Sequence, residues 1–249
     1  MPGRLDIFPL GDRALVIEVA DGVSEVATGR ARRLAERVTR ARLPGVREVV
    51  PAFCSIAVHY DPVALGALGL PFEILSTRLL ALLSGPEDET PPPGKVLEIP
   101  VCYAGDYGED LAALALARDM TPARFAELHC APTYFVGMLG FAPGFPYLAG
   151  MDQRLIAARR ATPRPRVPAG SVAIGGEHTG IYPFESPGGW HLIGRTPLRL
   201  FGLDRDPPSL LQAGDRVRFA PIAPDEFQRR AESQRTAELQ RAERKATWR

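Results

Sequence analysis

Glycine and proline dominate one long stretch of this chain. Residues 131–198 hold 11 glycines and 9 prolines in 68 positions, out of 49 such residues in the whole 249-residue sequence. Both residue types destabilise a helix interior, so this stretch cannot form long helices. Its composition favours short strands joined by tight turns, which predicts a β-barrel or β-sandwich. The candidate strands lie at residues 134–139, 171–174, 190–193, 197–201 and 216–219.

The first hundred residues instead alternate between strand and helix patterns. Apolar residues repeat every three or four positions from Ala27 to Ala41, which predicts a helix that Asp21 or Ser24 could cap. A second, densely apolar helix is expected near residues 72–83. The whole chain is therefore predicted to be α+β, with an N-terminal β-α-β-β-α-β unit of the split βαβ type. Its strands are expected at residues 13–19, at 46–50 with a break at Pro51, at 54–60 and at 96–101.

Composition also predicts where the domains end. The proline-rich segment 84–95 reads as a linker, which gives an N-terminal α/β domain over residues 1–90 and a β-barrel domain over 91–222. Because the strand at 96–101 follows this linker directly, it could belong to either domain. Residues 223–249 are mostly charged and are expected to form a helix or a tail, either frayed or packed on a partner.

Charge and hydropathy exclude several classes of protein. Thirty basic and 29 acidic side chains give a net charge of +1, which lacks the basic surplus of a nucleic-acid-binding protein. We find no signal peptide and no apolar run of the ~18 residues that a membrane span needs, so a cytoplasmic protein is expected. The three cysteines cannot all pair within the chain and are expected to be reduced thiols.

Familiar catalytic motifs are missing. The four histidines form no H-E-x-x-H and no short spacing with carboxylates or cysteines, so no metal site is expected. The sequence also lacks the nucleophile elbow G-x-S-x-G, the dinucleotide-binding G-x-G-x-x-G after a strand, and the phosphate-binding loop with its lysine. A stand-alone enzyme of a familiar mechanistic type is therefore disfavoured.

A candidate binding cleft remains in the stretch rich in glycine and proline. Prolines extend the segment around Arg164 and Arg166, so that both side chains are expected on one side, able to hold a phosphate or carboxylate. Gly188 and Gly189 could bring backbone N–H groups against an anion. The alternative is purely structural, because barrel corners need glycine and proline and large aromatic rings more often belong to a core.

Three long motifs in this region carry a family resemblance. The runs GFAPGFPYLAG, ATPRPRVPAGSVAIGG and TGIYPFESPGGWHLIGRTP strongly resemble the allophanate hydrolase subunit 1 family. Shorter matches at Gly11–Leu15, Val50–Ser55 and Pro100–Tyr103 extend the resemblance over about residues 8–222. The family includes one component of the bacterial 5-oxoprolinase complex and an inhibitor of a sporulation histidine kinase.

The resemblance implies a fold, a reaction and partners. The fold would be a small α/β domain joined to a cyclophilin-like β-barrel. The reaction would convert 5-oxo-L-proline, ATP and water to L-glutamate, ADP and phosphate, with Mg²⁺ carried by the ATP. It would require a C-like subunit from the allophanate hydrolase subunit 2 family and an A-like subunit. The alternatives are a carboxyltransferase or allophanate-pathway component, and a non-catalytic inhibitor of a histidine kinase.

The resemblance also suggests roles for individual residues. Arg164, Arg166 and Arg195 would bind anionic groups of ATP, of a phosphorylated intermediate or of the substrate. His129 would transfer a proton, because its ordinary pKa lies near ~6.5, or would instead cap the preceding helix. The residues expected to contact the ligand are Phe141, Pro143, Gly144, Phe145, Tyr147, Tyr182, Ser186, Gly188, Gly189 and Trp190.

Overall fold

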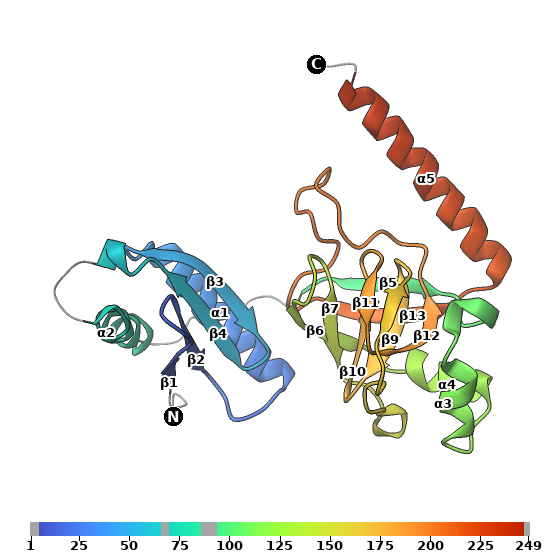
Figure 1. Ribbon diagram of the computed structural model, residues 1–249, viewed down its shortest axis with the longest axis horizontal. Helices are drawn as coiled ribbons and strands as arrows, with labels where there is room; N and C mark the ends of the chain where they lie inside the picture. The colour runs from blue at the N-terminus through green and yellow to red at the C-terminus, as the bar shows by residue number, and fades with distance from the viewer. Residues whose placement is uncertain (1–4, 66–69, 86–93, 247–249) are drawn as a thin grey trace. The chain divides into compact units, whose positions relative to one another are not determined.

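The chain divides into two compact units, Met1–Gly94 and Lys95–Arg249. The computed structural model describes residues 5–65, 70–85 and 94–246, with residues 237–246 described as backbone only (Figure 1). Most of the expected linker, residues 84–95, lies outside the described part of the chain. The division falls at the end of that segment, and each unit has its own hydrophobic core.

A four-stranded antiparallel sheet forms the first unit, with strand order β1-β2-β4-β3. Its register places Leu15 opposite Val58 and Ile17 opposite Ile56, so these buried side chains share one face. The strands are β1 (Asp6–Pro9), β2 (Ala14–Glu18), β3 (Val46–Ala52) and β4 (Ser55–Tyr60).

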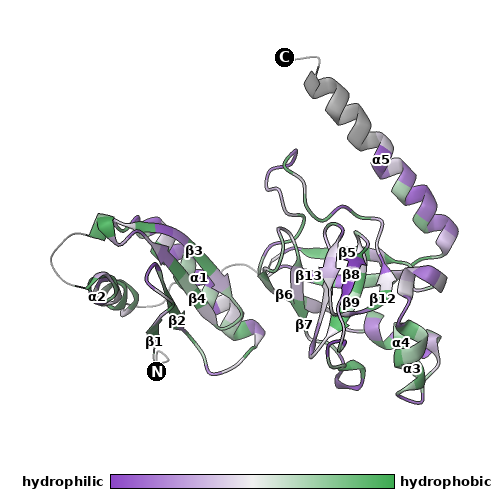
Figure 2. Ribbon diagram, in the orientation of Figure 1, coloured by the Kyte–Doolittle hydropathy of each residue, from purple (hydrophilic) through white to green (hydrophobic). Residues whose placement is uncertain are grey.

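Helix α1 (Glu25–Ala41) covers the apolar face of this sheet, and helix α2 (Pro71–Leu83) packs against α1. Helix α1 begins at Ser24, whose hydroxyl accepts a hydrogen bond from the Ala27 N–H at 3.1 Å. Its buried side includes four of the five apolar residues expected from the repeat, whereas Ala41 at its end is exposed. Helix α2 carries a green, hydrophobic ribbon in Figure 2, and its buried leucines join the same core.

The element order of this unit differs from the expected β-α-β-β-α-β. The strand at residues 96–101 belongs to the second unit, and strand β1, which the sequence analysis missed, pairs with β2 instead. The predicted break at Pro51 is also wrong, since Pro51 pairs with Ile56 within β3. Strand β3 lies at the sheet edge, where a residue without an N–H is tolerated.

A nearly closed seven-stranded sheet forms the second unit, with order β12-β9-β10-β7-β6-β13-β5. Its two outer strands meet where Cys102 and Arg195 exchange backbone hydrogen bonds of 2.8 and 2.9 Å. A short pair, β11 with β8, lies beside it. The strands are β5 (Val96–Val101), β6 (Tyr134–Leu139), β7 (Pro146–Ala149), β8 (Arg164–Val167), β9 (Ser171–Gly175), β10 (His178–Ile181), β11 (Ser186–Gly188), β12 (His191–Arg195) and β13 (Arg216–Pro221).

The α-helices of this unit lie at its two flanks in sequence, and a short 3-10 helix, Gln153–Leu155, lies between β7 and β8. Short helices α3 (Leu111–Leu116) and α4 (Pro122–Cys130) precede the stretch rich in glycine and proline, and α5 (Pro224–Ala246) follows the last strand. The hydrophilic colour of the described start of α5 in Figure 2 agrees with its charged sequence, which includes an ion pair between Glu226 and Arg230 at 2.6 Å.

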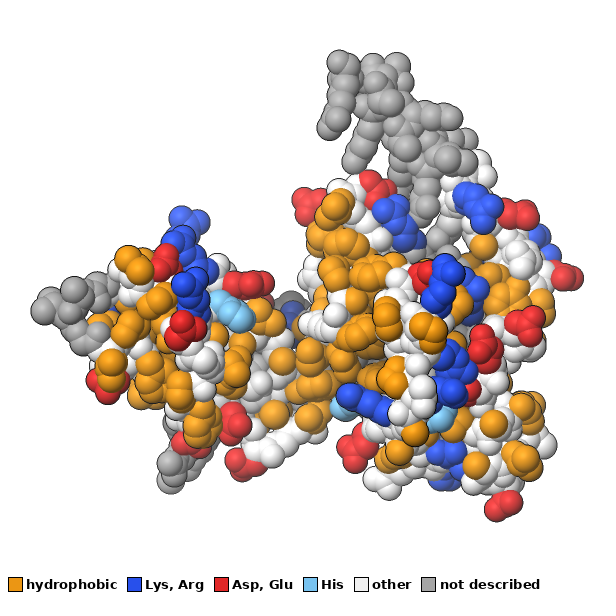
Figure 3. Space-filling model, in the orientation of Figure 1, with side chains coloured by type: hydrophobic (Ala, Val, Ile, Leu, Met, Phe, Trp, Pro, Cys, Tyr) orange, Lys and Arg blue, Asp and Glu red, His pale blue; other side chains and the backbone are white. Residues whose placement is uncertain are grey.

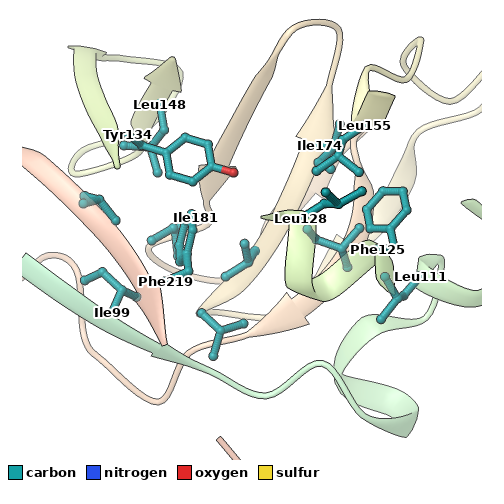
Figure 4. Packing of buried hydrophobic residues seen from close by; sticks show 14 of the residues in the cluster. Ile99, Leu111, Phe125, Leu128, Tyr134, Leu148, Leu155, Ile174, Ile181 and Phe219 are labelled. Carbon is teal, nitrogen blue, oxygen red and sulfur yellow. The ribbon is translucent and has the colours of Figure 1, made fainter. Parts of the chain in front are cut away.

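The barrel interior holds the larger core of the chain. Tyr134, Phe219 and Ile181 fill one end of it, and Phe125 from α4 packs at the other (Figure 4). The α+β class with a barrel is thus confirmed, and four of the five strands expected after residue 130 are present. Residues 197–201 form only an isolated bridge from Phe201 to Ser209, whereas β7, β8, β10 and β11 were not expected from the sequence.

Alanine substitutions at two glycines with positive φ, Gly170 and Gly176, test how tightly the barrel turns are packed. At Gly170 (φ 79°) an added Cβ would lie 2.2 Å from the Thr196 carbonyl oxygen, whereas at Gly176 (φ 65°) it would meet nothing within 4 Å. Gly176→Ala is expected to cost about 1 kcal/mol of unfolding free energy from backbone strain alone. Gly170→Ala should cost clearly more, about 2–4 kcal/mol, measured by urea denaturation. Equal losses of unfolding free energy in the two variants would show that the close approach of residues 170 and 196 does not require glycine at position 170.

Candidate functional site

Five aromatic residues meet on one side of the barrel, and we call them the aromatic cluster: Phe141, Phe145, Tyr147, Tyr182 and Trp190. The Phe145 ring lies at its centre, with edge-on contacts to Tyr182 at 5.1 Å and Trp190 at 5.5 Å between ring centroids. Such edge-on pairs are favourable for aromatic quadrupoles. The structure thus brings together five of the ligand-contacting residues expected from the sequence.

Tight turns position these rings. Phe141 and Gly144 both have positive φ, at 66° and 80°, in the loop that joins β6 to β7. Phe141 stays 63% exposed over the buried Phe145 ring, and Pro143 in the same loop is also exposed. At Gly188 an added Cβ would lie 2.3 Å from the Tyr182 hydroxyl oxygen, so only glycine leaves room for that ring.

A buried carboxylate organises the neighbouring arginines, and we call this group the Asp110 network. One carboxylate oxygen of Asp110 accepts from Arg164 Nη2 at 2.8 Å and from Arg160 Nη1 at 3.0 Å. The other oxygen accepts from the Leu192 N–H at 2.7 Å. Arg164 also contacts Glu109 at 3.2 Å. Asp110 therefore joins the start of α3 to β12 and to the segment that leads into β8.

The electrostatics of Asp110 follow from these contacts. Burial raises the pKa of its carboxyl, but the hydrogen bonds from Arg164 and the Leu192 N–H, together with the charges of Arg164 and Arg160, outweigh burial and lower that pKa. The carboxylate is therefore ionised at neutral pH, and two guanidinium groups are fixed beside it.

The three arginines expected to share an anion have separate partners. Arg166 is exposed and donates two hydrogen bonds to Glu185, at 2.9 and 2.7 Å, although it lies two residues from Arg164 on the same strand. The Arg195 Nε donates to the Ala169 carbonyl at 2.8 Å, at the point where the barrel closes. The structure thus directs the guanidinium groups of Arg164, Arg166 and Arg195 to different acceptors.

Three polar atoms around the Asp110 network have no hydrogen-bond partner among the residues that the structure describes. They are Arg160 Nε, Arg164 Nη1 and the Ser186 hydroxyl, and each is buried. Buried polar groups without partners are uncommon in folded proteins. Ser186 was expected to contact a ligand, and it lies on β11 opposite Val167. These atoms are available to an acceptor such as a water molecule or an anionic oxygen.

Tyr182 connects the aromatic cluster to the Asp110 network. Burial raises the pKa of its hydroxyl, and this effect is opposed by a hydrogen bond from the backbone N–H of Trp190 and by the charges of Arg159 and Arg164. Leu192 packs against the cluster while its N–H holds Asp110. The site therefore combines ring surfaces with fixed positive charge. Figure 3 shows basic and histidine side chains set among apolar ones on the face of this unit that is drawn.

His129 lies in a different environment, fully buried in the barrel core. Thr179 donates its hydroxyl hydrogen to the Ala173 carbonyl, so its oxygen must accept from His129 Nε2–H at 3.0 Å. His129 Nδ1 is then an acceptor for the Tyr103 hydroxyl at 2.8 Å, which in turn accepts from the Cys130 thiol at 3.3 Å. This directed chain fixes the neutral Nε2–H tautomer. The histidine lies in the last turn of α4, and its side chain joins α4 to β10.

A cavity of about 640 Å³ lies beside α4 and the start of α5, lined mainly by apolar residues that include Leu111, Ala126 and Ile222. None of the residues expected to bind a ligand lines it. Within the described part of the chain, no three His, Cys, Asp or Glu side chains are grouped so as to hold a metal ion. The described helices include none with the length and apolar character needed to cross a membrane.

Sequence reasoning missed Asp110, Arg159 and Arg160 as members of the site. Asp110 lies 50 or more residues before the arginines that it pairs with, and no local spacing connects them. Arg159 and Arg160 precede the proline-spaced pair without a motif of their own. Only the closed barrel brings these segments together.

The chain belongs to the family described as carboxyltransferase domain, subdomain C and D, because the sequence model of that family matches residues 5–211. It is 39% identical over 232 residues to the B subunit of 5-oxoprolinase from Bacillus subtilis, and the match covers 91% of this chain and 97% of that protein. The chain is thus related to a component of an enzyme complex.

Solved structures of related proteins have the same fold. The protein TTHA0988 is 40% identical, with a TM-score of 0.72 over 85% of this chain, and this chain spans only 40% of that longer one. The urea amidolyase of K. lactis has a TM-score of 0.74 over 90% of this chain but is 22% identical and far longer, so that this chain covers 15% of it. The second likeness supports the fold alone.

Neutralising Asp110 is expected to weaken the fold in a pH-dependent way. Asp110→Asn should lower the free energy of unfolding by about 2–3 kcal/mol at pH 7, because two guanidinium groups lose their anion. Since the native pKa lies below the unfolded value, the ionised carboxylate stabilises the fold above about pH 4, and this contribution is lost as the pH falls through the native pKa. Urea denaturation at several pH values measures the difference in unfolding free energy between the wild type and Asp110→Asn. This difference should become smaller below about pH 4.

The control is Glu185→Gln, which removes the carboxylate of the exposed pair with Arg166. Exposed ion pairs contribute little to stability, so this change should cost much less. The role given to Asp110 would be contradicted if Glu185→Gln lost as much stability as Asp110→Asn. It would also be contradicted if the difference between wild type and Asp110→Asn did not change with pH.

The buried His129 should make stability depend on pH in a second range. Burial lowers the pKa of His129 to about 3, whereas an unfolded histidine titrates near ~6.5. Unfolding therefore takes up a proton between these values, and stability should fall by up to about 1.4 kcal/mol per pH unit as the pH decreases below ~6.5. Urea denaturation between pH 5 and 7.5 measures this slope, which His129→Gln should make clearly shallower and the exposed control His59→Gln should keep. An unchanged slope in His129→Gln would show that this ring does not titrate on unfolding.

Proposed function

We propose that this chain is the B subunit of an ATP-dependent 5-oxoprolinase and acts only in complex with a C-like subunit, together with an A-like subunit. The observation that carries the proposal is the relationship to the B subunit of 5-oxoprolinase from Bacillus subtilis, at 39% identity over 97% of that protein's length. The complex acts in the cytoplasm, where ATP is available. The free thiols of Cys54, Cys102 and Cys130 suit a reducing compartment.

The proposed reaction opens a five-membered lactam at the expense of ATP. An unstrained amide is a poor electrophile, and transfer of the terminal phosphoryl group of ATP to its oxygen makes the carbonyl carbon more reactive. A first water molecule then adds to that carbon, and the ring C–N bond breaks with a proton going to nitrogen, which leaves an acyl phosphate. A second water molecule hydrolyses the acyl phosphate, so that the carboxylate forms and phosphate leaves. The products are L-glutamate, ADP and phosphate, and any Mg²⁺ enters with the nucleotide.

In this proposal the chain supplies a binding surface rather than the whole catalytic centre. The aromatic cluster offers apolar ring faces and edges to the flat lactam, and the Asp110 network offers fixed positive charge to anionic oxygens. Arg160 Nε, Arg164 Nη1 and the Ser186 hydroxyl, which lack partners among the described residues, are the donors proposed for these oxygens. The exposed Arg166, and Arg195 at the point where the barrel closes, are proposed to add further positive charge for anionic groups of the ligands.

A carboxyltransferase-type protein is the second candidate. The family description, carboxyltransferase domain, favours it directly. Such a protein would act on a small urea-derived amide, and the same aromatic cluster and arginines would serve it. The two candidates differ in their substrate and in whether a biotin-dependent carboxylase takes part.

The proposal predicts an activity that appears only on assembly. The chain should be co-expressed and purified with its A-like and C-like partner subunits, and ADP and glutamate formation measured with ATP and 5-oxo-L-proline. The assembled complex should form both products in equal amounts, and this chain alone should form neither. Turnover by the isolated chain would contradict the proposal, as would an assembled complex that acts on urea but not on 5-oxoproline.

A further inference from the structure

Other arginines in this part of the barrel are already engaged by carboxylates of the chain. Arg160 and Arg164 pair with Asp110, and Arg166 pairs with Glu185. Arg159 differs from them, because it is exposed and has no ion pair with any residue that the structure describes. An exposed guanidinium without an internal carboxylate keeps its full set of donors for a ligand.

The backbone around Arg159 is fixed alongside the aromatic cluster. Ala157 forms a bridge with Gly176. The Ala158 carbonyl accepts from His191 Nε2 at 3.0 Å, and the Arg160 N–H donates to the Gly189 carbonyl at 2.8 Å. Since these partners flank residue 190 on both sides, Arg159 is held next to Trp190.

Tyr147 contacts two other aromatic side chains, Trp190 and His178, on this side of the barrel. The Tyr147 ring lies 5.6 Å from Trp190 and 6.5 Å from the His178 ring, both edge-on. Burial raises the pKa of Tyr147, and the charge of Arg159 opposes that rise. Burial also lowers the pKa of His178, where Glu177 acts in the opposite direction and Arg159 adds to the decrease. The Arg159 guanidinium is therefore near enough to Tyr147 and His178 for its charge to act on both.

We infer that Arg159 binds the carboxylate of a small ligand whose flat, uncharged part packs against Tyr147 and the aromatic cluster. A guanidinium fork matches the two oxygens of a carboxylate, and the rings beside it give an apolar surface for the remainder of the ligand. The ligand class is a small carboxylate with a planar ring or amide. This inference rests on the proposed function for its choice of 5-oxo-L-proline, which has both parts.

The position of Arg159 also explains how an anion can bind near a network that contains a carboxylate. Arg160 and Arg164 already hold the carboxylate of Asp110, whereas the outer Arg159 pairs with no carboxylate within the described part of the chain. Loss of its charge is therefore expected to reduce affinity for the carboxylate while the Asp110 network and the fold stay intact. Arg159 is thus assigned as a specificity-determining residue.

The test compares Arg159→Gln, Arg159→Lys and the control Arg154→Gln in the assembled complex. Arg154 is exposed and pairs with Asp152, outside the site. Arg159→Gln should raise the KM for 5-oxoproline about tenfold or more, with kcat within about twofold, because the lost charge-assisted contact belongs to binding. Arg159→Lys should lie between wild type and Arg159→Gln, since an ammonium keeps the charge but not the fork. Arg154→Gln should leave both constants unchanged.

A second measurement separates this inference from the proposed function. The chain has two tryptophans, so Trp248→Phe leaves Trp190 as its fluorescent reporter. The full chain with this change should be titrated with 5-oxoproline and with pyrrolidin-2-one, the same lactam without a carboxylate. Binding of 5-oxoproline should be tighter by a factor of about ten or more, and adding Arg159→Gln should abolish that preference.

The outcomes are distinct. A complex without 5-oxoproline turnover would refute the proposed function, while a carboxylate preference that depends on Arg159 would still support the inference. If the Arg159→Gln complex retains the wild-type KM, the inference is wrong even though the proposed function stands. It is also wrong if the chain that carries Arg159 binds 5-oxoproline and pyrrolidin-2-one equally tightly.

Discussion

The buried carboxylate of Asp110 holds the site of this protein together. It accepts hydrogen bonds from Arg160, Arg164 and the Leu192 N–H, so one side chain connects the start of α3 with β12 and with the segment before β8. A buried anion of this kind requires partners, because leaving a charge unpaired in a protein interior is costly. The same contacts fix the arginines at the border of the aromatic cluster. Stability and the arrangement of the site therefore depend on a single group.

The sequence predicted those parts of the fold that depend on patterns within one short segment of the chain. The repeat that begins at Ala27 predicted α1, and glycine and proline density predicted the barrel. Long-range pairing was not accessible, as strand β5 shows by joining β13 in parallel over 100 residues away. Short strands such as β8 and β11 were also missed, since prolines at residues 165 and 187 obscure an alternating pattern of only three or four residues.

The sequence predicted which residue types form the site but not which side chains contact each other. Aromatic residues placed between turn-forming residues predicted a ring-lined surface, and Phe145 with its neighbours forms one. The sequence did not reveal that Arg164, Arg166 and Arg195 each have a separate acceptor within the chain. Those acceptors include a carboxylate far away in the sequence and a backbone carbonyl, which residue types alone do not reveal. The sequence likewise did not reveal that His129 is fully buried in the barrel core.

The central claim is that the ligand binds where the aromatic cluster meets the Asp110 network, rather than in the apolar cavity beside α4. Hydrogen-exchange mass spectrometry of the assembled complex, with and without 5-oxoproline and ATP, tests it most directly. The account predicts slower backbone exchange in residues 140–147, 157–164 and 186–191 when the ligands are present, with little change in α4. Protection confined to α4 and the start of α5, with those three segments unaffected, would contradict it.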